Sequence, residues 1–380
     1  MAVTGIQVPA AQAKAEETRN ALTLWYDEPA SQGQNILSAG SGYSDSDGSN
    51  TWQQQTLPIG NGDMGANVYG EIVSEHLTFN EKTLWTGGPS ESRPNYMGGN
   101  NVSKGQNGAM IKQIQESFLN GNTSQAVSWC GTYLVGDQAG YGAYQAWGDI
   151  YFDYKDITAG DAADYVRELD LTTAIASVAF TANGTEYTRE FFVSHDDNVL
   201  VARLEANGSG KLNFDVRFPS DQGGSTVAEN NNTLKLCGAV SDNQLKYASY
   251  LTVVPEDGTV TGSGDKLTVS DATAVADVDA AVENGYEAVK ASHLSDYQEM
   301  FDRMTLDLGQ EVSDKTTDQL LATYKNGSAS EAEQRQLEVM LFQYGRYLKL
   351  HVQEKIPSYH PTFRVYGAST TIHLGHLTTI

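Results

Sequence analysis

The hydrophobic pattern of this chain changes its period once, and that change limits the folds available to it. Over residues 22–254, short apolar stretches alternate with Gly, Asn, Asp and Ser, a pattern typical of many short strands joined by turns. From about Glu283, apolar residues recur at steps of three and four, as on an amphipathic helix. The sequence therefore predicts a mainly β protein: a large antiparallel β region followed by helices.

The clearest predicted strands show two-residue alternation and lie at 150–154, 176–181, 187–194, 198–205, 211–218 and 247–254. Asn183 and Gly184 stand between two of them and predict a tight hairpin turn. One helix, residues 108–119, interrupts the β region. So many strands with so few helices favour a two-sheet sandwich over a doubly wound fold.

Three helical segments follow the β region. A linker helix begins near Glu283, and a shorter segment covers residues 317–324. The third, residues 331–348, places one set of apolar residues on a single face: Leu337, Met340, Leu341, Tyr344, Gly345 and Leu348. A helical domain is therefore predicted to begin here.

Charge and composition exclude several classes of partner. The chain has 24 Lys+Arg against 48 Asp+Glu, a formal charge of -24, which repels phosphate backbones and anionic lipid surfaces. We therefore expect neither nucleic acid nor membrane as a partner. The two cysteines, Cys130 and Cys237, predict two free buried thiols, with a single bridge as the alternative.

The first 21 residues are expected to lie outside the fold. Ala11, Gln12 and Ala13 follow a mildly apolar stretch, as at a signal-peptidase site. The segment 1–21 is interpreted as the remnant of a signal peptide with a flexible start, a flexible terminus alone being the alternative. The signal-peptide interpretation predicts a secreted protein, extracellular or on the cell surface of a bacterium.

Three stretches carry a resemblance to a known family: residues 57–66 (LPIGNGDMGA), 77–89 (LTFNEKTLWTGGP) and 344–348 (YGRYL). Supporting pieces follow in family order at 145–152, 166–171, 187–190 and 285–309. Together they resemble glycoside hydrolase family 95, the α-L-fucosidase type, over about residues 22–348. The resemblance implies a β super-sandwich, a helical linker and an (α/α)6 barrel that holds the active site.

The resemblance implies the following organisation: a sandwich domain at 22–280, a helical linker at 281–310, and the first helix of an incomplete barrel within 311–348. It also implies inverting hydrolysis of a fucosylated or related oligosaccharide, by a Glu acid and a water held by Asn and Asp side chains. The family carries these groups on the barrel, so no catalytic residue is assigned to this chain. The resemblance thus implies that the barrel, as a further part of the same polypeptide, is the missing partner of the sandwich. No cofactor and no metal ligand is predicted.

Residues 80–85 provide the candidates for a substrate-facing loop. Asn80, Glu81 and Trp85 combine an amide, a carboxylate and a ring, which suit sugar hydroxyls and sugar faces. The residue type of Trp85 nevertheless favours a Trp buried in the sandwich over such a loop. Five glycines are interpreted as residues that serve turns with positive φ or a close backbone approach, against a loop that reaches a neighbouring sugar pocket: Gly60, Gly62, Gly65, Gly87 and Gly88.

Other titratable residues are given structural interpretations. Asp63, Asp149 and Glu190 show no spacing that ties two of them to one site, and solvated carboxylates are expected on so acidic a chain. His293 lies on the apolar side of the linker helix and is interpreted as a satisfied core or interface histidine, with no metal-spaced His, Asp or Glu beside it.

The last 32 residues differ in composition from the rest. Residues 349–380 hold four of the seven histidines, and Lys349, Lys355 and Arg364 against Glu354 give a local charge of +2. Nucleotides that could encode this stretch can, in another reading frame, encode short peptides that resemble the family's sequence at the start of the barrel. We interpret 349–380 as an out-of-frame tail, a genuine tail being the alternative. A deletion is also expected between Val254 and Glu283, which makes the last sandwich strands doubtful.

A rival interpretation is a non-catalytic carbohydrate-binding or structural β-sandwich at the cell surface, with its Tyr-rich surface as the site. The apolar helical face at 331–348 argues against it, since an isolated β module has no use for such a face.

Overall fold

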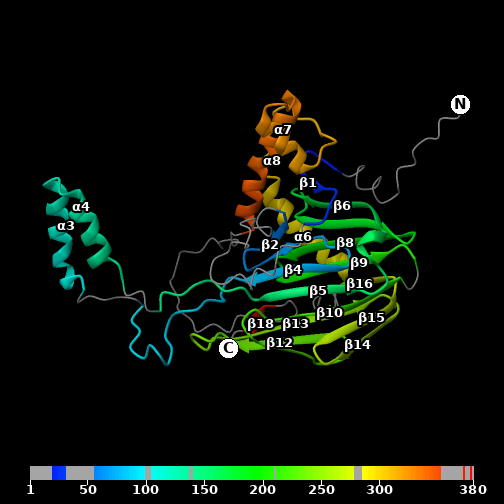
Figure 1. Cartoon of the computed structure of the whole chain (residues 1–380), viewed down its shortest axis with the longest axis horizontal. Helices are drawn as coiled ribbons and strands as arrows, with labels where there is room; N and C mark the ends of the chain where they lie inside the picture. Colours follow the sequence, from blue (N-terminus) through cyan, green and yellow to red (C-terminus); the bar gives the residue numbers. More distant parts are fainter. Residues whose placement is uncertain are drawn as a thin grey trace. The chain divides into compact units, whose positions relative to one another are not determined.

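The structure is a computed structural model that describes residues 19–30, 55–98, 104–136, 140–208, 211–277 and 285–351, with the short strands β17 (Thr371–Ile372) and β18 (Leu377–Thr378) (Figure 1). Most of the predicted signal-peptide remnant and nearly all of the predicted out-of-frame tail lie outside these residues.

Two antiparallel sheets form the β region (Figure 1). The nine-stranded sheet has the order β1 (Thr23–Tyr26), β6 (Ala162–Asp170), β7 (Ile175–Ala182), β8 (Thr185–Ser194), β9 (Val199–Ala206), β16 (Ala274–Asp277), β13 (Lys246–Pro255), β12 (Thr233–Ala239) and β11 (Ser225–Ala228). The seven-stranded sheet has the order β14 (Thr259–Ser263), β15 (Lys266–Ala272), β10 (Leu212–Arg217), β5 (Gly148–Tyr154), β4 (Ser74–Glu81), β3 (Met64–Val68) and β2 (Leu57–Gly60). The predicted two-sheet sandwich is confirmed.

The hairpin between β7 and β8 shows how local sequence sets the register. Asn183 and Gly184 both have positive φ, 51° and 75°, as the predicted two-residue turn requires. Phe180 then pairs with Tyr187 across the hairpin, and their rings stack with centroids 5.3 Å apart. Both rings are buried, so this face of the hairpin belongs to the core.

The doubt about the last sandwich strands was wrong for residues 259–277. Here β14 and β15 form one edge of the seven-stranded sheet, while β16 pairs with both β9 and β13. Leu267 and Val269 of β15 are fully buried, because alternate residues of this strand face the core. Residues 278–284 lie outside the described part of the chain.

The three predicted helices after the sandwich are present as α6 (Tyr286–Phe301), α7 (Thr317–Asn326) and α8 (Glu331–Leu350). Val289 of α6 packs on Phe192, Val199 and Val201, so strands β8 and β9 are buried on both faces. Ser330 accepts a hydrogen bond from the Glu333 N–H, and Glu333 accepts one from the Ser330 N–H. This capping box fixes the start of α8.

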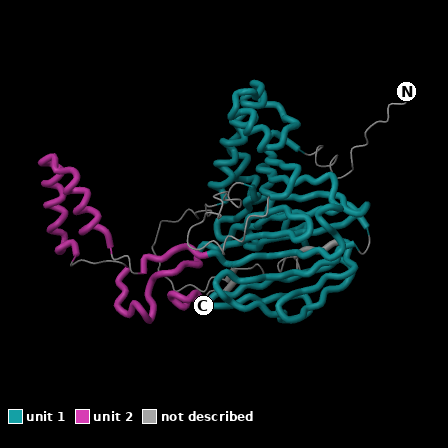
Figure 2. Tube along the Cα trace, viewed as in Figure 1, with its two compact units in different colours: residues 1–82, 146–238, 247–380 teal, residues 83–145, 239–246 magenta. Residues whose placement is uncertain are grey.

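By internal contacts the chain divides into two compact units (Figure 2). One comprises Met1–Lys82, Ala146–Gly238 and Tyr247–Ile380; the other comprises Thr83–Gln145 and Ala239–Lys246. The second unit contains the predicted helix as α3 (Ala109–Leu119), then α4 (Thr123–Trp129). It also contains short helical turns at Gln106–Gly108 and Cys130–Leu134. A third short turn, Ala159–Asp161, belongs to the first unit.

Two further observations concern membrane-spanning helices and the cysteines. None of the described helices is both long and apolar enough to cross a membrane. Cys130 and Cys237 are free thiols, as predicted, and each is half-buried rather than buried.

A buried arginine joins the two sheets. Arg189 of β8 and Glu75 of β4 form an ion pair in which both side chains are fully buried. The guanidinium also donates to the carbonyls of Glu71 and Ile72. It lies over the rings of Tyr154 and Phe180, 4.6 and 5.0 Å from their centroids.

Replacing Arg189 should therefore be costly. We expect Arg189→Met to lower the free energy of unfolding by about 3–5 kcal/mol, because Glu75 and two carbonyls lose their partner inside the core. Urea denaturation measures the loss. The matched control is Arg217→Met, which breaks the partly exposed pair with Asp153 and should cost less than about 1 kcal/mol. Equal losses in the two variants would contradict this account.

Candidate functional site

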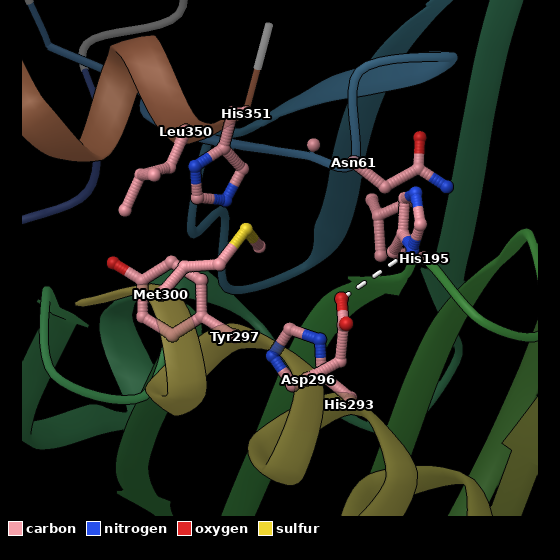
Figure 3. Close-up of a pocket in the computed structure, with 10 residues that line it drawn as sticks. Asn61, His195, His293, Asp296, Tyr297, Met300, Leu350 and His351 are labelled. Atoms are coloured by element: carbon pink, nitrogen blue, oxygen red, sulfur yellow. Dashed lines mark ion pairs between the residues drawn. The ribbon is translucent and has the colours of Figure 1, made fainter. Parts of the chain in front are cut away.

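A pocket lies in the first unit where the β2–β3 hairpin, the β8–β9 turn, α6 and the end of α8 meet (Figure 3). Its lining is rich in polar and titratable side chains: Gly60, Asn61, Val193, His195, His293, Asp296, Tyr297, Met300, Leu350 and His351. Segments far apart in sequence thus supply one site.

Asn61 shapes the hairpin side of the pocket. Its Oδ1 accepts from the N–H groups of Asp63 and Met64 at 2.9 and 2.8 Å. Its Nδ2 donates to the Ser194 carbonyl and to Asn198 Oδ1, both at 2.9 Å. One amide therefore closes the turn and holds it against the end of β8.

The glycines beside Asn61 serve the turn. Gly62 has φ 93°, and a Cβ on Gly60 would stand 3.0 Å from the Met64 carbonyl oxygen. The structural interpretation of these glycines is confirmed. The same turn also lines a pocket, through Gly60 and Asn61.

Two further histidines, His293 and His351, line the pocket. His293 is buried and donates from Nε2 to the Thr173 carbonyl at 2.9 Å, and burial lowers its pKa. Burial also lowers the pKa of His351 to about 4, and its ring lies 3.9 Å from that of Tyr347. The interpretation of His293 as a satisfied histidine is confirmed.

His195 belongs to a different group. Its Nδ1 lies 3.4 Å from Asp296 Oδ2 (Figure 3). It also lies 3.5 Å from Asp196 Oδ1. Asp296 stands three residues after His293, on the same helix, and is 5% exposed. The group of His195, Asp196 and Asp296 has the donor atoms of a metal site, and it does not include His293.

A second acidic cluster lies on the seven-stranded sheet. Asp149 is 6% exposed, so the expectation of a solvated carboxylate was wrong for it. Its Oδ1 lies 2.9 Å from His76 Nε2, and the His76 ring stacks on Tyr69 and Tyr151. Burial, and then the charge of Asp149, raise the pKa of Asp221 to about 7.

The other two acids have separate partners. Asp63 pairs with Lys82, and Glu190 accepts from Tyr286 and Lys290. Asp63, Asp149 and Glu190 thus take part in three different clusters, in agreement with the absence of a linking pattern in sequence.

The three loop candidates have different surroundings. Asn80 Oδ1 accepts from the Trp147 N–H at 2.8 Å, and Glu81, the last residue of β4, is fully buried. Trp85 belongs to the second unit and is 47% exposed, with its ring 5.4 Å from that of Tyr144. The favoured interpretation of Trp85 as a Trp buried in the sandwich was therefore wrong.

Sequence reasoning missed most of this pocket. His195 and Asp196 are separated by 100 residues from Asp296, and only the packing of α6 on β8 and β9 brings them together. The detectable signal was Asp296 itself, since a residue three positions from His293 lies on the same side of a helix.

The Asp149–Asp221 pair predicts a pH dependence. The pKa of Asp221 is raised to about 7 from 3.8, so the folded state binds more protons between these values. Stability should therefore fall as pH rises from about 4 to 7. We expect Asp221→Asn to raise the Tm at pH 8, because a neutral amide replaces one of two carboxylates, and to change it little at pH 5.

The control for this experiment is Asp153→Asn on the same sheet. Burial opposes the charge of Asp153, but hydrogen bonds from Arg217 and Ser74 outweigh it and lower the pKa. This variant should lose Tm at pH 8. A rise in both variants would argue against a specific Asp149–Asp221 pair.

Asn61 yields a second prediction. Asn61→Ala should lower the free energy of unfolding by about 2–3 kcal/mol, because four hydrogen bonds are lost and buried backbone groups keep no partner. Asn67→Ala, which removes a single 3.3 Å bond to Thr78, is the control and should cost under about 1 kcal/mol. Chemical denaturation of both variants checks the difference, and an equal cost would refute the assigned role.

Comparisons with known proteins place these features in a family. Residues 24–288 match the family model "Glycosyl hydrolase family 65, N-terminal domain", and residues 285–352 match "Glycosyl hydrolase family 95 catalytic domain". The two matches meet at the start of α6, where the sandwich gives way to helices.

Three curated relatives are similar to the chain. "Alpha-L-fucosidase 2" of Arabidopsis thaliana is 28% identical, over 77% of this chain and 40% of its own length. "Probable alpha-fucosidase A" of Aspergillus niger is 30% identical, over 86% and 42%. The protein of the same name from Aspergillus oryzae is 23% identical, over 77% and 45%. The chain thus spans less than half the length of these relatives.

The family 65 model alone covers well over half of the chain, and the family 95 model continues directly from it. The chain therefore belongs to the glycoside hydrolases, with an N-terminal domain of the family 65 type joined to a segment that matches the family 95 catalytic domain.

Proposed function

We propose that this chain is the N-terminal part of a secreted α-L-fucosidase-type glycoside hydrolase that acts on fucosylated glycans. The observation that carries the proposal is the unbroken order of the two family matches, 24–288 and 285–352, over a sandwich on which α6 is packed. The printed names of all three relatives, which are α-fucosidases, support the substrate class.

The Asp149–Asp221 pair of the sandwich does not suit glycoside hydrolysis. The two carboxyl groups of a glycosidase stand about 5–5.5 Å apart in retaining enzymes and about 6.5–9.5 Å apart in inverting ones. Asp149 and Asp221 are hydrogen-bonded to each other, so they are too close for either geometry. This pair is therefore no candidate for the acid and base, which in our proposal belong to the barrel.

Activity measurements test this proposal. The 380-residue chain should release no fucose from a 2'-fucosylated oligosaccharide, while a version whose frame is corrected after Leu348 should release it. Measurable turnover by the 380-residue chain would contradict the proposed division of labour. The nucleotide sequence of the gene provides an independent check, since its alternative reading frame after Leu348 should encode a peptide similar to the start of the family's barrel.

A second candidate function is non-catalytic glycan binding by the second unit. It is favoured by exposed aromatic rings there: Trp85 is 47% and Tyr141 84% exposed. Trp85 is held firmly, because its carbonyl accepts from Asn243 Nδ2 at 2.9 Å. Of Asn80, Glu81 and Trp85, we propose Trp85 as the residue that contacts sugar. Glycan binding by the 380-residue chain that is lost in Trp85→Ala would favour this function.

A further inference from the structure

We infer that the pocket binds one divalent transition-metal ion, of the Zn²⁺ type, through His195 Nδ1 and the carboxylates of Asp196 and Asp296. The three donor atoms lie within 4.8 Å of one another. They come from two elements: His195 and Asp196 from the β8–β9 turn and Asp296 from α6. An ion here would join the linker helix to the sandwich.

The distances match ligands of a common ion better than direct hydrogen bonds. Metal–ligand bonds of Zn²⁺ to nitrogen and oxygen are about 2.0–2.2 Å, so two ligands of a tetrahedral site lie about 3.4 Å apart. His195 Nδ1 is 3.4 Å from Asp296 Oδ2 and 3.5 Å from Asp196 Oδ1. An N–H···O bond prefers about 2.9–3.0 Å.

The His195 Nδ1 atom supplies an independent observation. It is shielded from solvent, yet it has no hydrogen-bond partner among the described residues. Buried polar atoms rarely stay without partners, and an ion that the coordinates do not include is one recognised reason. A cation between Nδ1 and the two carboxylates would satisfy it.

The donor types select the ion. An imidazole nitrogen with carboxylate oxygens suits Zn²⁺ or a similar transition metal, whereas Ca²⁺ and Mg²⁺ prefer oxygen ligands alone. Three protein ligands leave a fourth position for water on the pocket side.

Neighbouring hydrogen bonds hold the ligands in place. Ser292 donates to Asp196 Oδ2 at 3.4 Å, and Asn61 fixes the Ser194 carbonyl, one residue before His195. Such outer contacts orient ligands and increase metal affinity. The proposal is independent of the catalytic function, because it concerns how α6 is attached to the sandwich.

Titration of the purified 380-residue chain with Zn²⁺ after removal of metal by a chelator tests the inference. We expect one ion to bind by calorimetry and to raise the Tm. His195→Gln and Asp296→Asn should each weaken binding at least tenfold. The control Glu190→Gln, which removes the pair with Lys290 at the same α6–β8 contact, should keep full metal affinity.

Several results would overturn the inference. Absence of saturable Zn²⁺ binding would do so, as would binding that is unchanged in both ligand variants, which would assign the ion to other residues. Equal stabilisation by Ca²⁺ would refute the transition-metal assignment. If the variants do not fold, the visible spectrum of the Co²⁺-loaded wild-type chain decides the question, since a tetrahedral site with these ligands gives intense bands and an octahedral one does not.

Discussion

The contact between Arg189 and Glu75 is the constraint on which the sandwich depends. A guanidinium enclosed on all sides needs an opposite charge and hydrogen-bond acceptors close by. Here one carboxylate and two carbonyls accept from the two terminal nitrogens and two ring faces lie beside the group, while Nε has no hydrogen-bond partner among the described residues. Because β8 provides the arginine and β4 its acidic partner, the pair also determines which residues of the two sheets face each other. Apolar packing alone would allow one sheet to shift by a residue pair relative to the other more easily than this ion pair does.

The hairpin at Asn61 depends on this alignment. The β2–β3 turn can reach the end of β8 only if the seven-stranded sheet is correctly placed against the nine-stranded one, and Asn61 then bonds Ser194 and Asn198. The end of β8 in turn presents His195 towards α6. The pocket is thus a product of sheet alignment, although none of its lining residues belongs to the Arg189 contact.

The sequence predicted the sandwich, the first helix of the second unit and the three later helices, because alternation and three-four periodicity are local properties. It did not predict β14 to β16, since this stretch is rich in Thr, Ser and Asp and lacks long apolar runs. The pocket was also beyond it: His195 and Asp296 meet only through the packing of a helix on a sheet. The substrate-facing role of Trp85 stays a prediction, and its exposure could not be deduced from a motif of glycines and aromatics. The proposed domain boundaries stay predictions.

The position of β16 has a consequence for the order in which the chain can fold. Strands β6 to β9 follow one another as hairpins and need only local contacts, but β13 joins them through β16, which pairs with β9 on one side and β13 on the other. Contacts between distant segments form slowly. During synthesis, therefore, the nine-stranded sheet stays divided into two parts until residue 277 has left the ribosome, and it is completed just before the linker helix emerges to cover it.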